Sequence, residues 1–204
     1  MSKKPIIVFE GIEGSGKSFH IKNVENYLKG KKLSYVKFRE PGGTTNSEKI
    51  RKLILKDKTN FNPTTDLLLY LASRSENVEK IIKKNLNKKI ILIDRFIDWM
   101  IAYQHYGLNV NKKTIETLKN WILKKIKVDF TFLNTVNIRN LKKRLSVRKK
   151  LNRYDRFKFT FYSRVQKGFI KLSKKNKKKY LIVDSNKPIQ FNKKIIINKV
   201  NKII

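Results

Sequence analysis

The sequence lacks several features, and each absence excludes a class of protein. It contains no cysteine, so disulfide bonds and cysteine-ligated zinc are excluded. No apolar run reaches the roughly 18 residues of a membrane-spanning helix, so we expect no membrane segment. The first residues lead at once into an apolar run and a glycine-rich loop, and we therefore expect no cleavable signal peptide. These absences predict a cytoplasmic protein.

Acidic residues are also scarce, with 15 aspartates and glutamates against 50 lysines and arginines and a formal net charge of +35. An excess of this size is typical of nucleic-acid-binding proteins. Most of these basic residues are lysines spread along the chain, and they accompany abundant isoleucine and asparagine. All three residue types have A/T-rich codons, so genome base composition can produce the bias. We expect no nucleic-acid partner, and a non-catalytic nucleic-acid-binding protein is kept as an alternative of another class.

Glycine and proline number only 8 and 4, and no linker rich in them divides the 204 residues. We therefore expect one domain over residues 1–204. Short apolar runs predict strands at 5–10, 33–38, 89–93, 129–133 and 179–183. Helices are predicted between and after them, over 18–30, 44–56, 64–86, 112–126, 137–149, 157–174 and 189–203. This alternation favours an α/β fold with a parallel sheet.

The most specific motif is G-x-x-x-x-G-K-S, which follows the first predicted strand and precedes a predicted helix. Its residues are Gly11, Ile12, Glu13, Gly14, Ser15, Gly16, Lys17 and Ser18. Glycines at these positions let backbone N–H groups wrap around phosphate oxygens. Lys17 would reach the outer phosphates and the Ser18 hydroxyl would bind Mg²⁺. The motif therefore predicts binding of a nucleoside triphosphate.

In a parallel α/β sheet, ligands bind beyond the carboxyl ends of the strands, so the polar residues that follow each strand are candidates. Asp94 and Arg95 follow the third predicted strand. The carboxylate can bind Mg²⁺ directly or through water, and the guanidinium can hold a phosphate with two hydrogen bonds. Arg39 follows the second strand and is presented by a Pro-Gly-Gly turn.

Three further groups suit a nucleotide, although each also has a purely structural explanation. Tyr70 and Arg74 lie four residues apart on one helix face. The tyrosine ring could stack on a base while the arginine binds a phosphate, or the pair could be a core tyrosine beside a surface arginine. Within residues 102–104, the Tyr103 ring and the Gln104 amide could contact a nucleoside. The densest arginine group consists of Arg144, Arg148, Arg153 and Arg156. An arginine on a mobile segment stabilises a phosphoryl group in transfer, and the alternative is a solvated basic surface.

Taken in order along the chain, these motifs resemble the thymidylate kinase family of nucleoside monophosphate kinases. The matching segments are residues 9–18, 39–44, 68–74, 94–96, 102–104, 152–155, 161–169 and 183–184. The resemblance implies a P-loop NTPase three-layer sandwich, with a five-stranded parallel sheet flanked by helices and a short lid at about 144–157. It also implies a homodimer.

The implied reaction is the phosphorylation of dTMP to dTDP with MgATP, in dTTP synthesis. The implied catalytic residues are Lys17, Asp94, Arg95 and Arg153, the ATP site is residues 11–18 with Arg148, and the Mg²⁺ ligands are Ser18 and Asp94. The implied acceptor site consists of Glu13, Arg39, Pro41, Tyr70, Arg74, Arg95, Met100, Tyr103 and Gln104. In it, Glu13 lies near the sugar 3′-hydroxyl, Tyr70 stacks on thymine, and Tyr103 excludes a ribose 2′-hydroxyl. Arg74 and Arg95 bind the monophosphate.

The chain departs from the family at two positions of the acceptor site. Trp99 and Met100 stand where the family commonly has serine, threonine or asparagine in contact with the base. Tryptophan and methionine cannot make the same hydrogen bonds, and an apolar site discriminates less between bases. A kinase for another nucleoside monophosphate or for a nucleoside is therefore the alternative within enzymes. Ser15 stands where some members have arginine, so the catalytic arginine is expected from the lid.

Overall fold

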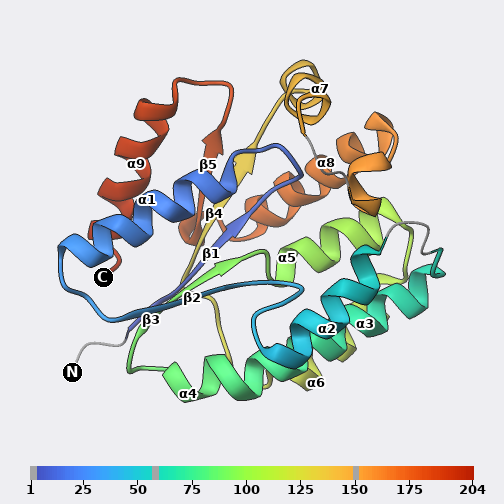
Figure 1. Cartoon of the computed structure of the whole chain (residues 1–204), viewed down its shortest axis with the longest axis horizontal. Helices are drawn as coiled ribbons and strands as arrows, with labels where there is room; N and C mark the ends of the chain where they lie inside the picture. The colour runs from blue at the N-terminus through green and yellow to red at the C-terminus, as the bar shows by residue number, and fades with distance from the viewer. Residues whose placement is uncertain (1–3, 57–59, 149–151) are drawn as a thin grey trace.

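The computed structural model describes residues 4–56, 60–148 and 152–204. Its centre is a parallel sheet with the strand order β2-β3-β1-β4-β5 (Figure 1). The strands are β1 Ile6–Glu10, β2 Tyr35–Arg39, β3 Ile90–Asp94, β4 Phe130–Thr135 and β5 Tyr180–Asp184. All five predicted strands are confirmed, and the central ones are buried on both faces because helices cover both sides of the sheet.

Two helices cover one face of the sheet, α1 Lys17–Gly30 and α9 Ile189–Asn201, which lie side by side in Figure 1. Phe9 of β1 and Phe132 of β4 stack at 4.9 Å between ring centroids, and they pack against Leu28 and Val200 of these helices. Apolar residues at alternate strand positions thus face α1 and α9, and the intervening ones face the opposite layer.

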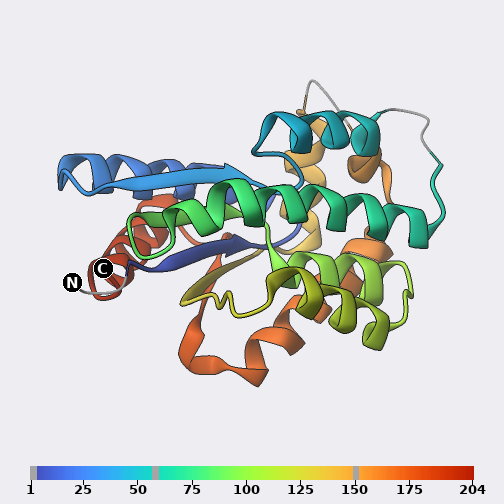
Figure 2. The ribbon, with the colours of Figure 1, turned by 90° about the horizontal axis from the view of Figure 1, so that it is seen from below.

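The opposite layer contains most of the remaining helices. A long helical segment from α3 Pro63–Asn77 through a π-helical turn Val78–Ile82 to α4 Lys83–Asn85 runs along the sheet (Figure 2). This confirms the helix predicted over 64–86. The other helices are α2 Thr45–Leu55, α6 Lys112–Leu123, α7 Ile138–Ser146 and α8 Phe159–Lys175, with short 3₁₀ turns at Arg153–Arg156 and Lys177–Lys179. The predicted three-layer α/β architecture is confirmed.

Side-chain caps explain where several helices begin. Thr44, Asn62, Asn111 and Asn137 each precede a helix and accept a hydrogen bond from a backbone N–H three residues later. Such caps satisfy one of the unpaired N–H groups of the first turn. No helix among the described residues combines the length and the apolar character that crossing a membrane requires.

One helical segment was not predicted from the sequence. The short helix α5 Ile97–Met100 continues into a π-helix Ile101–Gly107 directly after β3. Most of this segment is buried on all sides, so its sequence carries no alternation of apolar and polar faces. The segment matters because it carries Trp99, Met100 and Tyr103.

The predicted lid, residues 144–157, is described except for residues 149–151, which lie outside the described part of the chain. It begins in the last turn of α7 and ends in the 3₁₀ turn Arg153–Arg156. A capping box closes that turn: the Asn152 side chain accepts from the backbone, and the Asp155 carboxylate accepts from Asn152 N–H at 2.8 Å.

The strand register brings the polar strand ends together. Asp94 of β3 pairs with Phe9 of β1 on one side and with Arg39 of β2 on the other. The loop at 11–18, the turn after β2 and the α5 segment therefore start from the same edge of the sheet, which is where a ligand site is expected.

Candidate active site

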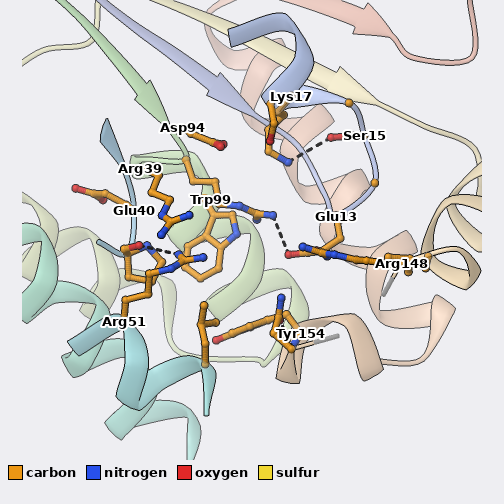
Figure 3. Close-up of a pocket in the computed structure, with 18 of the residues that line it drawn as sticks. Glu13, Ser15, Lys17, Arg39, Glu40, Arg51, Asp94, Trp99, Arg148 and Tyr154 are labelled. Carbon is orange, nitrogen blue, oxygen red and sulfur yellow. Dashed lines mark hydrogen bonds and ion pairs between the residues drawn. The ribbon is translucent and has the colours of Figure 1, made fainter. Parts of the chain in front are cut away.

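A cavity of about 330 Å³ opens at this edge, between the loop at 11–18, the turn after β2, α2, α3, α5 and the lid (Figure 3). It brings together twelve of the residues predicted for the site: Glu13, Gly14, Ser15, Gly16, Lys17, Ser18, Arg39, Pro41, Tyr70, Asp94, Arg95 and Arg148. Residues from one end of the sequence to the lid thus meet in one cavity.

The loop at 11–18 has the backbone conformation that its glycines allow. Gly11 has φ 136°, and a Cβ on it would lie 2.2 Å from the backbone oxygen of Asn134 in β4. No other residue fits there without displacing that strand. Gly16, with φ 81°, precedes α1 without a side-chain cap, so the first N–H groups of the helix are left for another acceptor such as phosphate.

Lys17 lies inside this loop and binds its backbone. Its Nζ donates to the carbonyl oxygens of Gly11 and Ile12, each at 2.8 Å. Burial, followed by the nearby positive charge of Arg95, lowers the pKa of Lys17 to about 8. The ammonium group is therefore still mostly protonated at pH 7, and it has no anionic partner in direct contact among the described residues, which suits a phosphate ligand.

The loop is braced from the far side by two residues. Arg144 of α7 donates from Nη1 to Gly14 O and from Nη2 to Ser185 O, both at 2.7 Å. The Ser185 hydroxyl in turn donates to Ser15 O at 2.6 Å. Arg144 was noticed in the sequence only as one of a group of arginines, because its partners are backbone oxygens that sequence spacing does not reveal.

Ser18 and Asp94 line the cavity together, as the predicted metal site requires. Asp94 Oδ1 is buried and has no hydrogen-bond partner among the described residues. Among all the described residues, no group of three or more histidine, aspartate or glutamate side chains lies close enough together to hold a metal ion. Mg²⁺ fits such a site, because it typically takes one or two protein oxygens and completes its octahedron with water and phosphate.

Arg95 forms the centre of the opposite end of the cavity. Its Nη2 is 2.8 Å from Glu13 Oε1, and the other Glu13 oxygen accepts a hydrogen bond from the Tyr103 hydroxyl. Burial alone would lower the pKa of Arg95, yet Glu13, followed by Tyr103 and Asp94, holds it well above its usual value. Arg95 adopts φ 67°, a strained backbone conformation of the kind found at functional sites.

Trp99 occupies the middle of the cavity in Figure 3, with Arg39 and Arg51 on one side and Glu13 on the other. Its ring centroid is 4.4 Å from that of Tyr70. Tyr70, which is predicted to stack on a base, is therefore covered in this arrangement by the indole of Trp99.

Four predicted acceptor residues lie behind the cavity wall, not on it. Arg74 is fully buried, and it donates to Glu40 Oε2 at 2.7 Å, to Phe96 O at 2.6 Å and to Met100 Sδ at 3.3 Å. Gln104 is buried with both amide atoms unpartnered among the described residues. Arg74, Met100 and Gln104 do not line the cavity, and neither does Tyr103, which reaches the site through Glu13.

The lid arginines have different surroundings. Arg148 lines the cavity and pairs with Asp155, and about half of its side chain is exposed. Arg153 does not line it; its Nη2 binds the buried Asp66 Oδ2 at 2.5 Å, next to the Tyr154 hydroxyl at 2.7 Å from the same oxygen. We call this contact of Asp66 with Arg153 and Tyr154 the lid latch.

The residues predicted for the site do not include all those that line the cavity, and Arg51 and Tyr154 are two of the omissions. Arg51 of α2 donates to Pro41 O at 2.8 Å, and burial lowers its pKa. Tyr154 closes the cavity from the lid side. In a chain whose positive charge comes mainly from lysine, an arginine on an amphipathic helix was a usable signal for Arg51, whereas nothing in the sequence distinguished Tyr154 from a core tyrosine.

Comparison with known proteins agrees with this geometry. The family model for thymidylate kinase matches residues 9–196. A thymidylate kinase of Thermosipho africanus is 38% identical over 184 residues, covering 90% of this chain and 90% of that protein, and one of Mycoplasma capricolum is 35% identical, covering 96% of each. The crystal structure of thymidylate kinase from Ehrlichia chaffeensis superposes with a TM-score of 0.80 at 31% identity, covering 98% of this chain and 99% of that one. The phosphate loop, the Asp94–Arg95 strand end and the lid thus occur within an end-to-end match, and the chain belongs to the thymidylate kinase family.

Proposed function

We propose that this protein transfers the γ-phosphoryl group of MgATP to dTMP, giving dTDP and ADP. The observation that carries the proposal is the shared cavity: the phosphate loop with Lys17 forms one end, and Arg95 with Glu13 and Tyr70 forms the other. Two phosphate-binding ends facing one enclosed space suit transfer between two nucleotides, because catalysis of phosphoryl transfer consists mainly of positioning and charge stabilisation.

In the proposed reaction, an oxygen of the dTMP phosphate attacks the γ-phosphorus of ATP, and the bond to the β–γ bridging oxygen breaks. Arg95 holds the attacking phosphate, and its pairing with Glu13 keeps the guanidinium oriented. Lys17 would move from the loop carbonyls to the ATP phosphates and balance the charge that develops on the leaving ADP. Ser18 and Asp94, the latter directly or through water, would hold Mg²⁺, which neutralises phosphate charge when bound.

The lid is proposed to supply Arg148 to the phosphates. Its side chain is partly exposed and faces the cavity, whereas Arg153 is held by Asp66 at the start of α3. The catalytic role predicted for Arg153 stays a prediction; its contacts support a role in anchoring the lid.

We also propose that the protein is a homodimer and that it is located in the cytoplasm. Homodimerisation is supported by exposed apolar side chains on two helices that pack together, Leu68 of α3 at 53% exposure and Trp121 of α6 at 73%. Burying such side chains between two copies would remove apolar surface from water. Light scattering after gel filtration would give twice the chain mass if this is right. The cytoplasmic location stays a prediction.

The deciding experiment is ADP release with MgATP against dTMP, dUMP, dCMP, dGMP, UMP and thymidine. We expect strong turnover with dTMP. Turnover with another acceptor alone would keep the mechanism and move the specificity, an alternative favoured by the apolar Trp99 and Met100 in place of hydrogen-bonding residues. Lack of turnover with every acceptor, in folded protein, would contradict the proposal and favour the nucleic-acid-binding alternative.

Two variants test the residues of this mechanism. Lys17→Ala and Arg95→Ala should each remove most of the activity while leaving the fold intact. Lys22→Ala is the matched control, because Lys22 lies on the exposed side of the same helix, about 61% exposed and 3.6 Å from Glu25. Near-normal turnover of either folded site variant would refute the assigned roles.

A further inference from the structure

The ring of Tyr70 is almost completely covered. Only 3% of the residue is exposed, although it lines the cavity in which an acceptor base would stack. The indole of Trp99 lies 4.4 Å from it, tilted by 51°, and the Tyr154 ring meets it edge-on at 6.2 Å. No base can stack on Tyr70 in this arrangement, so a base that uses this ring has to displace one of its neighbours.

Of these two neighbours, Tyr154 is the fixed one. Its hydroxyl donates to the buried Asp66 at 2.7 Å, and its backbone oxygen accepts from the Tyr162 hydroxyl. Trp99 has no comparable polar anchor, since its Nε1 is buried without a hydrogen-bond partner among the described residues. An unpaired buried donor is costly, and this cost disfavours the buried position of the indole.

The indole is nevertheless well packed as an aromatic ring. It stacks on Tyr103 at 4.5 Å and 24°, and the Arg95 guanidinium lies 5.7 Å from its centroid. Such contacts are the ones a nucleobase would make at the same place, since a flat ring next to tyrosines and an arginine is stabilised by stacking and cation–π attraction.

We infer that the Trp99 side chain competes with the acceptor base for the stacking position on Tyr70, and so sets the affinity and selectivity of the acceptor site. In the free protein the indole occupies this position; when the acceptor binds, the indole turns out of it. The inference rests on the proposed function for the identity of the acceptor, but the competition itself follows from the buried ring of Tyr70 and the unanchored Trp99.

A side chain that occupies the site lowers the apparent affinity of the ligand by the fraction of molecules in which the site is open. A minor open state of about 1–10% would weaken acceptor binding by about 10- to 100-fold. Replacing Trp99 with a small residue should therefore strengthen acceptor binding, which is the opposite of what loss of a simple contact residue would do.

The test is the KM and Kd of Trp99→Ser for dTMP, or for whichever acceptor the wild type turns over. We expect both constants to fall by about tenfold or more, with kcat changed much less. Phe191→Ser, at an exposed position on α9 away from the cavity, is the matched control and should leave both constants unchanged. An increase or no change in acceptor Kd in folded Trp99→Ser would overturn the inference.

A second measurement does not depend on the stability of that variant. The chain contains two tryptophans, so Trp121→Phe leaves Trp99 as the only indole. Saturation with acceptor should then shift its emission to the red and increase its quenching by acrylamide, because the buried ring becomes exposed. Unchanged emission and quenching at saturation would refute the displacement.

The outcomes separate this inference from the proposed function. Absence of turnover with all acceptors would refute the proposed function and this inference with it. Normal turnover of the wild type together with weaker acceptor binding by Trp99→Ser would refute this inference alone.

Discussion

The buried carboxylate of Glu10 offers the sharpest test of the energetics, through the variant Glu10→Gln. Glu10 is the last residue of β1 and is 1% exposed. Its Oε1 accepts from the backbone N–H groups of Phe96 at 2.9 Å and Trp99 at 3.2 Å, while Oε2 has no partner among the described residues. Burial, followed by the negative charge of Asp98, raises the pKa of Glu10 to about 8, although the two N–H donors oppose the shift.

The sign of the effect follows from linkage. The pKa of Glu10 is higher in the folded protein than its ordinary value of 4.5, so its contribution to stability is fully present below pH 4.5 and is lost as pH rises through about 8. One pKa unit corresponds to about 1.4 kcal/mol, so raising the pH from 5 to 7 should remove about 3 kcal/mol of folding free energy through this group. Glutamine keeps the acceptor oxygen and cannot ionise.

We therefore expect Glu10→Gln to be nearly neutral at pH 5 and more stable than the wild type by about 3 kcal/mol at pH 7. The measurement is urea unfolding of both proteins at pH 5, 6, 7 and 8, with the difference in free energy plotted against pH. Glu79→Gln, at an exposed i,i+4 pair with Lys83, is the control and should give a flat difference. A flat difference for Glu10→Gln as well would show that Glu10 is not protonated in the folded protein.

Three further outcomes follow from the site. With the pKa of Lys17 at about 8, kcat/KM for ATP should fall as pH rises through that value, by about tenfold per unit above it, and a profile flat to pH 9.5 would contradict the burial argument. Arg148→Ala should lower kcat by about 10²-fold and Arg153→Ala by much less, measured at saturating substrates; equal losses would refute the different roles assigned to them. Gly11→Ala should destabilise the protein by about 2 kcal/mol or more in urea unfolding because its Cβ would clash with β4, whereas Gly30→Ala, which meets nothing within 4 Å, should be neutral.

The sequence predicted the sheet and the phosphate loop because their information is local. Apolar runs mark the strands, and the glycines and Lys17 of the loop have a fixed spacing. It did not predict the α5 segment, whose burial on all sides removes the periodic pattern that identifies a helix. Nor did it show which arginines face the cavity: Arg74 and Arg153 are taken up by Glu40 and Asp66, which are distant in sequence and come near only through the fold.

The same limit applies to Trp99. Its substitution was visible in the sequence as a departure from the family, but a departure says only that a hydrogen bond is lost. The cover that its ring places over Tyr70 depends on the turn after β3 and on the neighbouring rings, and these are set by tertiary packing.

The lid latch joins the two nucleotide sites mechanically. Asp66 lies in the first turn of α3, one turn before Tyr70, and it holds Arg153 and Tyr154 of the lid. A lid movement that displaces Arg153 and Tyr154 must therefore either carry the start of α3 with it or break a buried ion pair. In the first case the binding of the two substrates is thermodynamically linked. If bound acceptor raises the affinity for the donor by some factor, bound donor raises the affinity for the acceptor by the same factor. Removing the Asp66 carboxylate should then make the two affinities independent of each other.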